Sequence, residues 1–373
     1  GACVSICPKQ AITMQPDAEG FLYPKVDGEK CVSCDLCEKR CPAGREMPER
    51  HAHLFGAQAR DEALRGQSSS GGVFTLLARE VIRQGGVVFG AAFDEALHVE
   101  HIGAFDESEL SGMRGSKYVQ SDAADAIGNA VSLLKRDIPV LFSGTPCQIS
   151  GLMAALGGTK TDKLLTVDFV CHGVPSPGVW ESFVADQAQR KRKAIASVRF
   201  RAKTEGWQKS YLTLRYEDGS QDSAPLYETE YGRAFGRSLF LRESCFRCPY
   251  SSLSRVGDLT LGDFWGLRPE ELAEQQEKGV SLLLINTPHG SHVFDRLSIG
   301  CKQYPAERAV AGNPRLASPT AYCPERAAFF AAYALEPFDQ VRREFCRLPP
   351  LPVRAAGRLL SPEVKAAIRK KLK

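Results

Sequence analysis

A cysteine stands where an apolar segment ends and a helix is expected to begin, in the stretch Pro139-Val-Leu-Phe-Ser-Gly-Thr-Pro-Cys-Gln148. Residues 140–142 predict a buried strand, and Gly144-Thr145-Pro146 predicts a turn whose proline suits the first turn of a helix. The Cys147 thiol would then lie at a helix amino end, where backbone N–H groups stabilise a thiolate or another anion. This position favours metal binding or redox chemistry. A nucleophilic thiol is the alternative, with His172 as its candidate base.

Three further cysteines could join Cys147. Residues 164–170 predict a second strand, which ends at Cys171-His-Gly-Val-Pro175. A strand, helix and strand within this length predict a right-handed crossover with parallel strands, so both cysteines would lie at one sheet edge. Open α/β sheets bind ligands at that edge, although two buried structural thiols would also fit. Cys245-x2-Cys248-Pro249 adds a pair at ligand spacing, which completes a set of four thiolates.

Six cysteines near the amino end have a different spacing. Cys31-x2-Cys34-x2-Cys37-x3-Cys41-Pro42 is the pattern of bacterial ferredoxins, and Cys3-x3-Cys7-Pro8 precedes it. In that pattern three thiolates hold one 4Fe-4S cluster and the fourth binds the other cluster. Zinc sites usually show two separated Cys-x2-Cys pairs, so we interpret this run as iron-sulfur ligands.

The crossed arrangement assigns Cys31, Cys34 and Cys37 to one cluster with Cys7, and Cys3 and Cys41 to a second cluster. The two other ligands of the second cluster would lie before Gly1, so the sequence looks truncated at its start. One ferredoxin cluster is therefore expected from these residues, and two in a longer chain that supplied the missing cysteines.

Two loops could bind a ligand. Gln67-Ser-Ser-Ser-Gly-Gly72 precedes a predicted helix and could cradle a phosphate with its backbone N–H groups, or simply cap that helix. Arg114-Gly-Ser-Lys-Tyr-Val-Gln-Ser121 combines two cations with hydrogen-bonding side chains, as a surface turn also would. Near residue 260, Asp258, Thr260 and Gly262 share one face of a short predicted strand, where an aspartate more commonly caps a turn.

Composition limits the class of protein. The chain has 373 residues, of which 43% are hydrophobic and 25% charged, with a net charge of +4. So small a charge argues against a nucleic-acid scaffold, and no apolar run approaches the roughly 20 residues of a membrane span. We expect a cytoplasmic protein. Of its 13 cysteines, ten are grouped as metal ligands would be, and Cys301, Cys323 and Cys346 are expected to be plain thiols.

The expected fold class is α+β or α/β: a small ferredoxin-like module, an α/β domain with a mixed sheet, and a helical carboxyl-terminal segment. The expected divisions are a module at 1–45, a linker at 46–66 that carries surface residues His51 and His53, a domain at 67–310 and an extension at 311–373. Strands are expected at 11–14, 20–24, 87–92, 140–142, 164–170, 195–202, 211–216, 258–262 and 280–285, and helices at 73–82, 123–136, 147–156, 177–193, 290–299 and 324–346.

Taken together, the motifs resemble those of the beta-subunit family of coenzyme F420 hydrogenase/dehydrogenase. The matching motifs are Ser68-Ser-Ser-Gly-Gly72, Arg114-Gly-Ser-Lys-Tyr-Val-Gln-Ser121, Ser143-Gly-Thr-Pro-Cys-Gln148, Cys171-His-Gly173, Ser244-Cys-x2-Cys-Pro249 and Gly262-Asp-Phe-Trp-Gly266. The resemblance implies an enzyme that binds FAD and a 4Fe-4S cluster in the 67–310 domain, behind a fused ferredoxin module. The family also includes reductases of other conjugated substrates, such as the plant hydroxymethyl-chlorophyll reductase.

The resemblance implies roles for particular residues. The internal cluster would be held by Cys147, Cys171, Cys245 and Cys248. The flavin would be lined by Ser68, Ser69, Ser70, Gly71, Gly72, Ser116, Lys117, Tyr118, Gln120, Ser121, Gly144, Thr145, Pro146, Gln148 and Asp263. Lys117 and His172 are the candidate catalytic residues. For Lys117 the reason is that a cation near the flavin N1 and C2 oxygen stabilises the anionic reduced ring.

These cofactors predict an iron-sulfur flavoprotein oxidoreductase. It would pass electrons between ferredoxin, or another redox protein or subunit, and a small organic molecule at FAD, with coenzyme F420 as the family's first suggestion. The alternatives are a reductase of another conjugated metabolite and an electron-transfer subunit without a substrate of its own. No nucleic-acid partner and no membrane span are expected.

Overall fold

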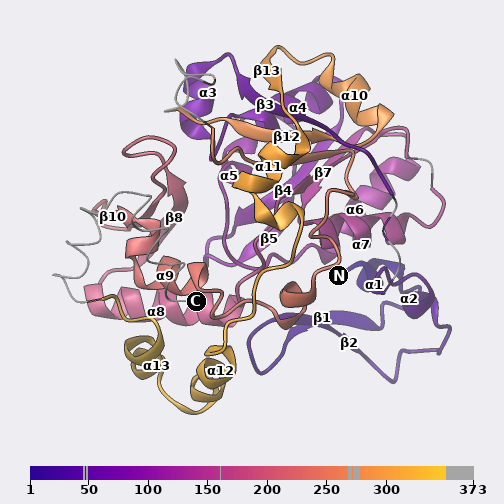
Figure 1. Ribbon diagram of the computed structural model, residues 1–373. Helices are drawn as coiled ribbons and strands as arrows, with labels where there is room; N and C mark the ends of the chain where they lie inside the picture. The colour runs from indigo at the N-terminus through magenta and orange to yellow at the C-terminus, as the bar shows by residue number, and fades with distance from the viewer. Residues whose placement is uncertain (45–46, 48, 160, 268–270, 272–277, 350–373) are drawn as a thin grey trace.

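The computed structural model describes residues 1–44, 47, 49–159, 161–267, 271 and 278–349, with an eight-stranded mixed sheet at its centre (Figure 1). Its strands are β3 (His53–Ala59), β4 (Val87–Phe93), β5 (Val99–Ala104), β6 (Val140–Gly144), β7 (Leu164–Phe169), β11 (Leu259–Asp263), β12 (Ser281–Ile285) and β13 (Ile299–Gln303). They lie in the order β13-β3-β12-β11-β7-β6-β4-β5. Strands β4, β6, β7 and β11 run parallel, and the other neighbouring pairs are antiparallel. Since β6 and β7 are parallel, they end at the same edge, as the sequence predicts.

Helices cover both faces of this sheet. Helix α4 (Val73–Arg83) packs on the face that carries Leu141 and Leu165. Helices α6 (Ala124–Lys135) and α7 (Pro146–Leu156) pack on the opposite face, which carries Val140 and Phe142. Successive strand residues point to opposite faces, so strands covered on both sides need unbroken apolar runs. Residues 87–89 of β4 and 140–142 of β6 satisfy that requirement, whereas β7 and β11 contain the buried polar residues Thr166, Asp168 and Thr260.

A second, antiparallel sheet has the order β10-β9-β8 and lies beside the first (Figure 1). It comprises β8 (Ile195–Ala202), β9 (Tyr211–Tyr216) and β10 (Gln221–Pro225). Four helices surround it: α8 (Pro177–Lys191), α9 (Glu230–Gly236), α12 (Arg326–Leu335) and α13 (Phe338–Phe345). Their shared core is aromatic, with Trp180, Phe200, Tyr231 and Phe329 each buried. The ring centroids of Trp180 and Tyr231 lie 5.1 Å apart, edge to face, which is a favourable geometry for aromatic pairs.

The amino-terminal module packs directly against both parts. It consists of α1 (Ala2–Ile6), the hairpin of β1 (Ile12–Pro16) and β2 (Leu22–Val26), and α2 (Leu36–Lys39). Helix α1 contacts α6 and α7, and Ala2 is buried in their core. Phe21 is buried in the aromatic core, against Phe330. The module therefore has a fixed place on the rest of the chain.

Shorter elements complete the described chain. They are α3 (Glu62–Gln67), α5 (Leu110–Met113), α10 (Pro288–Phe294), α11 (Ala306–Gly312) and the 3-10 helices η1 (Leu226–Glu228), η2 (Glu243–Arg247) and η4 (Pro314–Leu316). Within the described residues, no helix combines the length and the apolar character that a membrane crossing requires.

Three sequence expectations are corrected by the structure, which also contains elements that were not expected, such as β5, α9 and α11. The expected linker at 46–66 contains β3, which pairs with β12 and β13 inside the main sheet, and α3. The helix expected at 290–299 is the shorter α10, followed by β13. The helix expected at 324–346 is split into α12 and α13, because Pro337 lies at the break and a proline cannot continue a helix without losing a hydrogen bond. The end of the expected extension, 350–373, lies outside the described residues.

Candidate functional site

Four thiols from three segments gather at the carboxyl edge of β6 and β7. Cys147 lies in the first turn of α7, Cys171 follows β7, and Cys245 and Cys248 lie in and just after η2. Burial raises the pKa of the Cys171 thiol, and the neighbouring thiols of Cys245, Cys147 and Cys248 raise it further. The thiols are therefore close enough to interact electrostatically, and none is in a disulfide bond.

The backbone around these thiols is shaped to let them approach. Gly173 has a φ of 131°, which non-glycine residues rarely adopt, and a Cβ there would lie 3.2 Å from Cβ of Cys245. Cys147 is accessible at the surface, yet the surrounding protein atoms still raise the pKa of its thiol. Its Sγ lies 3.1 Å from Oγ1 of Thr145.

Four cysteine thiols could hold a single ion or a cluster. A tetrahedral zinc site, with Zn–S bonds near 2.3 Å, would hold its sulfurs about 3.8 Å apart. In the described part of the chain, no three His, Cys, Asp or Glu side chains converge in a way that could hold a metal ion. A 4Fe-4S cluster takes four thiolates spread around a larger body, and four thiols are what these segments offer.

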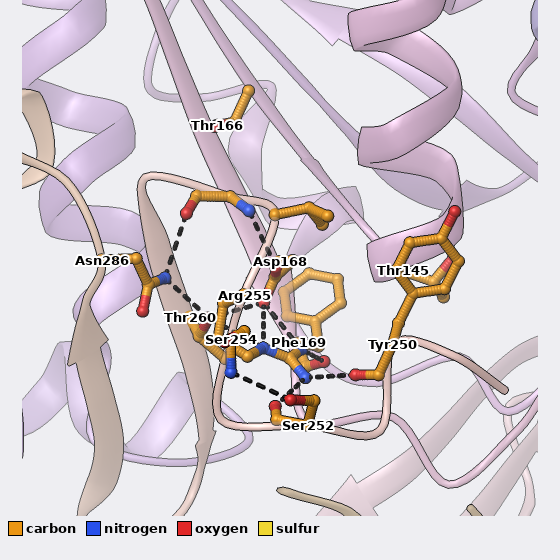
Figure 2. Close-up of polar contacts among 12 residues, drawn as sticks. Thr145, Thr166, Asp168, Phe169, Tyr250, Ser252, Ser254, Arg255, Thr260 and Asn286 are labelled. Atoms are coloured by element: carbon orange, nitrogen blue, oxygen red, sulfur yellow. Dashed lines mark hydrogen bonds and ion pairs between the residues drawn. The ribbon is translucent and has the colours of Figure 1, made fainter. Parts of the chain in front are cut away.

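A buried ion pair joins the strand before Cys171 to the loop after Cys248 (Figure 2). Nη2 of Arg255 donates to Oδ1 of Asp168 at 2.8 Å, and the exposed fractions of the two side chains are 2% and 0%. Arg255 also donates to the carbonyls of Tyr250 (2.8 Å) and Phe169 (2.8 Å). Asp168 further accepts from Oγ1 of Thr260 at 2.6 Å. One guanidinium thus fixes the 250–255 loop to β7.

Tyr250 joins the same loop to α7. Its side chain forms a hydrogen bond with Ser150 of that helix. Burial raises the pKa of Tyr250, and the thiols of Cys147, Cys248 and Cys41 contribute to the shift. Cys41 belongs to the ferredoxin motif, so the module presents one of its cysteines on the side where the internal thiols lie.

A cavity of about 1300 Å³ opens next to these thiols. Cys171 and His172 line it, as do most of the residues expected to line the flavin. Those residues are Ser68, Ser69, Ser70, Gly72, Ser116, Lys117, Tyr118, Ser121, Gly144, Thr145, Gln148 and Asp263. The fold thus brings the separate sequence motifs together around one space.

Three of the expected flavin residues do not line the cavity, and each has a structural contact instead. The backbone N–H of Gly71 donates to Oγ of Ser281 at 2.9 Å. The side chain of Gln120 accepts from the backbone N–H of Leu22 at 2.9 Å and donates to its carbonyl at 3.2 Å. Pro146 is buried as the first residue of α7.

The serine-rich loop does not cap the helix that follows it. Ser68 donates to the carbonyl of Leu64 at 2.8 Å, Ser70 donates to that of Val280 at 2.9 Å, and Ser69 contacts Ser116. The N-cap of α4 is Gly72, in the left-handed conformation, and no side chain caps the helix. Its first-turn N–H groups therefore lie at the cavity wall without a capping side chain, which suits a phosphate.

Lys117 and His101 are polar groups on this side of the cavity. Nζ of Lys117 donates to the carbonyls of Gly112 (2.6 Å) and Arg114 (3.3 Å), and burial lowers its pKa to about 7. His101 contacts the carbonyl of Ser143 through Nε2 at 2.9 Å, and burial lowers its pKa to about 4. The sequence has no motif around His101 that would have singled it out.

Asp263 is engaged by other side chains. Nη1 of Arg201 donates to its Oδ2 at 2.5 Å, and Nε1 of Trp207 donates to its Oδ1 at 2.8 Å. Its carboxylate thus has protein partners at both oxygens, while the residue also lines the cavity. His172 lies edge-on to Phe235, with Nε2 3.2 Å from Oγ of Ser238, and burial and Arg315 lower its pKa.

Sequence reasoning also missed a group of cavity arginines, because no motif or spacing singles them out. They are Arg201, Arg233, Arg237 and Arg315.

Two segments of the chain match known protein families. Residues 139–302 match the family described as the C terminus of the coenzyme F420 hydrogenase/dehydrogenase beta subunit, and residues 1–45 match the 4Fe-4S dicluster domain. No curated protein matches. Among solved structures, one similar chain comes from the F420-reducing [NiFe] hydrogenase complex of Methanosarcina barkeri, with 16% identity, a TM-score of 0.47, and coverage of 79% of this chain and 92% of that chain. The chain thus carries a segment of the coenzyme F420 hydrogenase/dehydrogenase beta-subunit family at residues 139–302 and a 4Fe-4S domain at its amino end.

Proposed function

We propose that the protein is an FAD-dependent oxidoreductase that passes electrons between a redox partner protein and an organic substrate bound beside the flavin. The observation that carries this proposal is the shared cavity. Its wall contains Cys171 of the four-thiol group together with the serine-rich loop, the 116–118 segment and the 143–148 turn.

The residues present fit FAD. The first turn of α4 offers N–H groups to a phosphate, next to a loop of small side chains. Lys117 is held by two backbone carbonyls on the same wall, which fixes the position of its Nζ beside the proposed ring. We assign the flavin to the cavity residues named above and leave Gly71, Gln120 and Pro146 as supporting residues.

The residues present also fit a 4Fe-4S cluster at Cys147, Cys171, Cys245 and Cys248. When bound, the clusters carry one electron at a time and FAD carries one or two, so together they can connect a one-electron partner to a two-electron substrate. The contribution of Cys41 to the Tyr250 environment supports an order in which electrons pass from the ferredoxin module to the internal cluster and then to the cavity.

Ferredoxin, or a partner subunit, is the proposed donor or acceptor at the module. Coenzyme F420 is the first candidate at the cavity, because the family is named for it.

Anaerobic purification followed by iron, sulfide and flavin analysis tests the proposal. We expect FAD to copurify with the clusters and to be reduced when the clusters are reduced. Clusters without any flavin, before and after incubation with FAD, would leave only an electron-transfer subunit. Reduced ferredoxin and coenzyme F420 can then be added separately, to identify which of the two exchanges electrons with the loaded protein.

A further inference from the structure

The cavity is larger than one ligand requires. Its volume of about 1300 Å³ exceeds the roughly 300–1,000 Å³ of ordinary ligand pockets. Its lining includes the serine-rich loop and the 143–148 turn, where the flavin is proposed. It also includes residues of α9 and of the segment 312–325, and we call the part lined by these two segments the α9 end. None of the proposed flavin residues belongs to these two segments, although Tyr118 stacks on Phe235 of α9 with ring centroids 4.6 Å apart.

Positive charge lines this cavity. The described lining residues include two acids, Asp263 and Glu325, and six cations: Arg114, Lys117, Arg201, Arg233, Arg237 and Arg315. Both acids are already paired, Asp263 with Arg201 and Glu325 with Arg237. In the described part of the chain, Arg233 and Arg315 have no ion pair. The α9 end therefore carries two uncompensated guanidinium groups.

Two arginines of the cavity wall also carry buried donors without acceptors. Nε of Arg233 is buried without a hydrogen-bond partner among the described residues. Nη2 of Arg201, a residue that is 8% exposed, is likewise buried without a hydrogen-bond partner among the described residues. Burial lowers the pKa of both Arg233 and Arg315, and Arg237 adds repulsion at Arg233. Buried donors without acceptors are costly, so a cavity that carries them suits a ligand that supplies anionic oxygens.

We propose that the α9 end of the cavity binds the anionic group of the organic substrate, a carboxylate or a phosphate, through Arg233 and Arg315. This inference rests on the proposed function, since it names the substrate class of the same cavity. A guanidinium binds two oxygens of such a group in one plane, which fixes both its position and its orientation. Arg315, His172 and Cys171 line the same cavity, so the anion would share that cavity with one of the four thiols.

The test compares two acceptors that share a ring and differ in charge. Prereduced holoprotein, freed of excess reductant, is mixed in a stopped-flow instrument with naphthoquinone sulfonate or with uncharged menadione. For R233Q and R315Q we expect the half-saturating concentration of the sulfonate to rise about tenfold or more, as for a lost charge-assisted bond. The value for menadione should stay unchanged. The control is R199Q, which removes an exposed charge from β8 and should alter neither value.

FAD content and the cluster EPR spectra are measured on every variant. If both acceptors respond alike in flavin-loaded variants, the substrate assignment is wrong while the proposed function stands. Loss of FAD from R233Q or R315Q would show that these arginines hold the flavin, which also overturns the assignment. A wild-type protein that never binds FAD refutes the proposed function, and the substrate assignment with it.

Discussion

The ion pair between Asp168 and Arg255 gives the sharpest test of how the internal thiols are held. Asp168 accepts from Arg255, from Oγ1 of Thr260 and from the backbone N–H of Gly257 at 2.9 Å, and its side chain is fully buried. In Asp168→Asn, an amide NH2 group would replace one of the two carboxylate oxygens that now accept hydrogen bonds, and it would face those donors. The Arg255 charge would also remain buried without its counter-ion. Removing one partner of a buried pair typically costs about 3–5 kcal/mol.

Urea denaturation under anaerobic conditions measures this cost. Asp168→Asn and Arg255→Gln should both shift the midpoint of unfolding to a much lower urea concentration. Arg343→Gln should change the free energy of unfolding by at most about 0.5 kcal/mol. Arg343 is a fair control because its side chain is 71% exposed and its ion pair with Asp339 lies on the surface of α13.

A double variant separates the pair from its neighbours. Combining the two changes, in Asp168→Asn/Arg255→Gln, should cost less than the sum of the single changes, because no isolated charge remains. Strict additivity, or single variants as stable as the wild type, would refute this account. Since Arg255 fixes the loop that follows Cys248, the EPR signal of the internal cluster should weaken in the single variants while the ferredoxin signal remains.

Three further predictions concern the cofactor residues. Cys147→Ser should remove the internal cluster and leave the ferredoxin cluster, which iron analysis and EPR would show, whereas exposed Cys301→Ser should lose no iron. Lys117→Ala should retain FAD but slow its reduction by about tenfold or more, if the cation stabilises the reduced ring; full-rate reduction would contradict this role. His101 has a pKa of about 4 in the folded protein against an ordinary value of 6.5. As the pH falls from 6.5 to 4, His101 therefore becomes protonated in the unfolded chain before it does in the folded protein, and the free energy of unfolding decreases. The loss should reach roughly 3 kcal/mol by pH 4, and His101→Gln should abolish it.

The fold could be predicted where periodicity was strong. The apolar runs at 140–142 and 164–169 have one structural solution, a strand covered on both faces, and the crossover rule then fixes their direction. Strand β3 could not be recognised, since His53 is polar and Gln58 is a buried polar residue within it. Gln58 is tolerated there because its Oε1 accepts from Arg65 at 3.1 Å, a contact that sequence periodicity does not reveal.

The site was only partly predictable for a related reason. Cysteines and glycine-rich loops can be recognised from their spacing in the sequence, so the motifs around Cys147 and Cys171 could be assigned to one sheet edge. Arg255 and Asp168 are 87 residues apart, and Arg233 and Arg315 also come from distant segments. Such pairs depend on tertiary packing alone, and local propensity carries no signal for them.

The docking of the ferredoxin module shows why its position matters for electron transfer. Gln120 lies within the 114–121 segment that lines the cavity, yet its amide is bound to both backbone groups of Leu22 in the module hairpin. Arg326, buried beside the aromatic core, pairs with Glu19 of the same hairpin, and the Arg242 guanidinium lies 3.9 Å from the ring centre of Tyr23. Arg242 also favours the thiolate forms of Cys147 and Cys245. The contacts that hold the module are thus made by the same segments that shape the cavity and the four-thiol group. A module bound in this way keeps Cys41 on the side of the molecule where Tyr250 and the internal thiols lie.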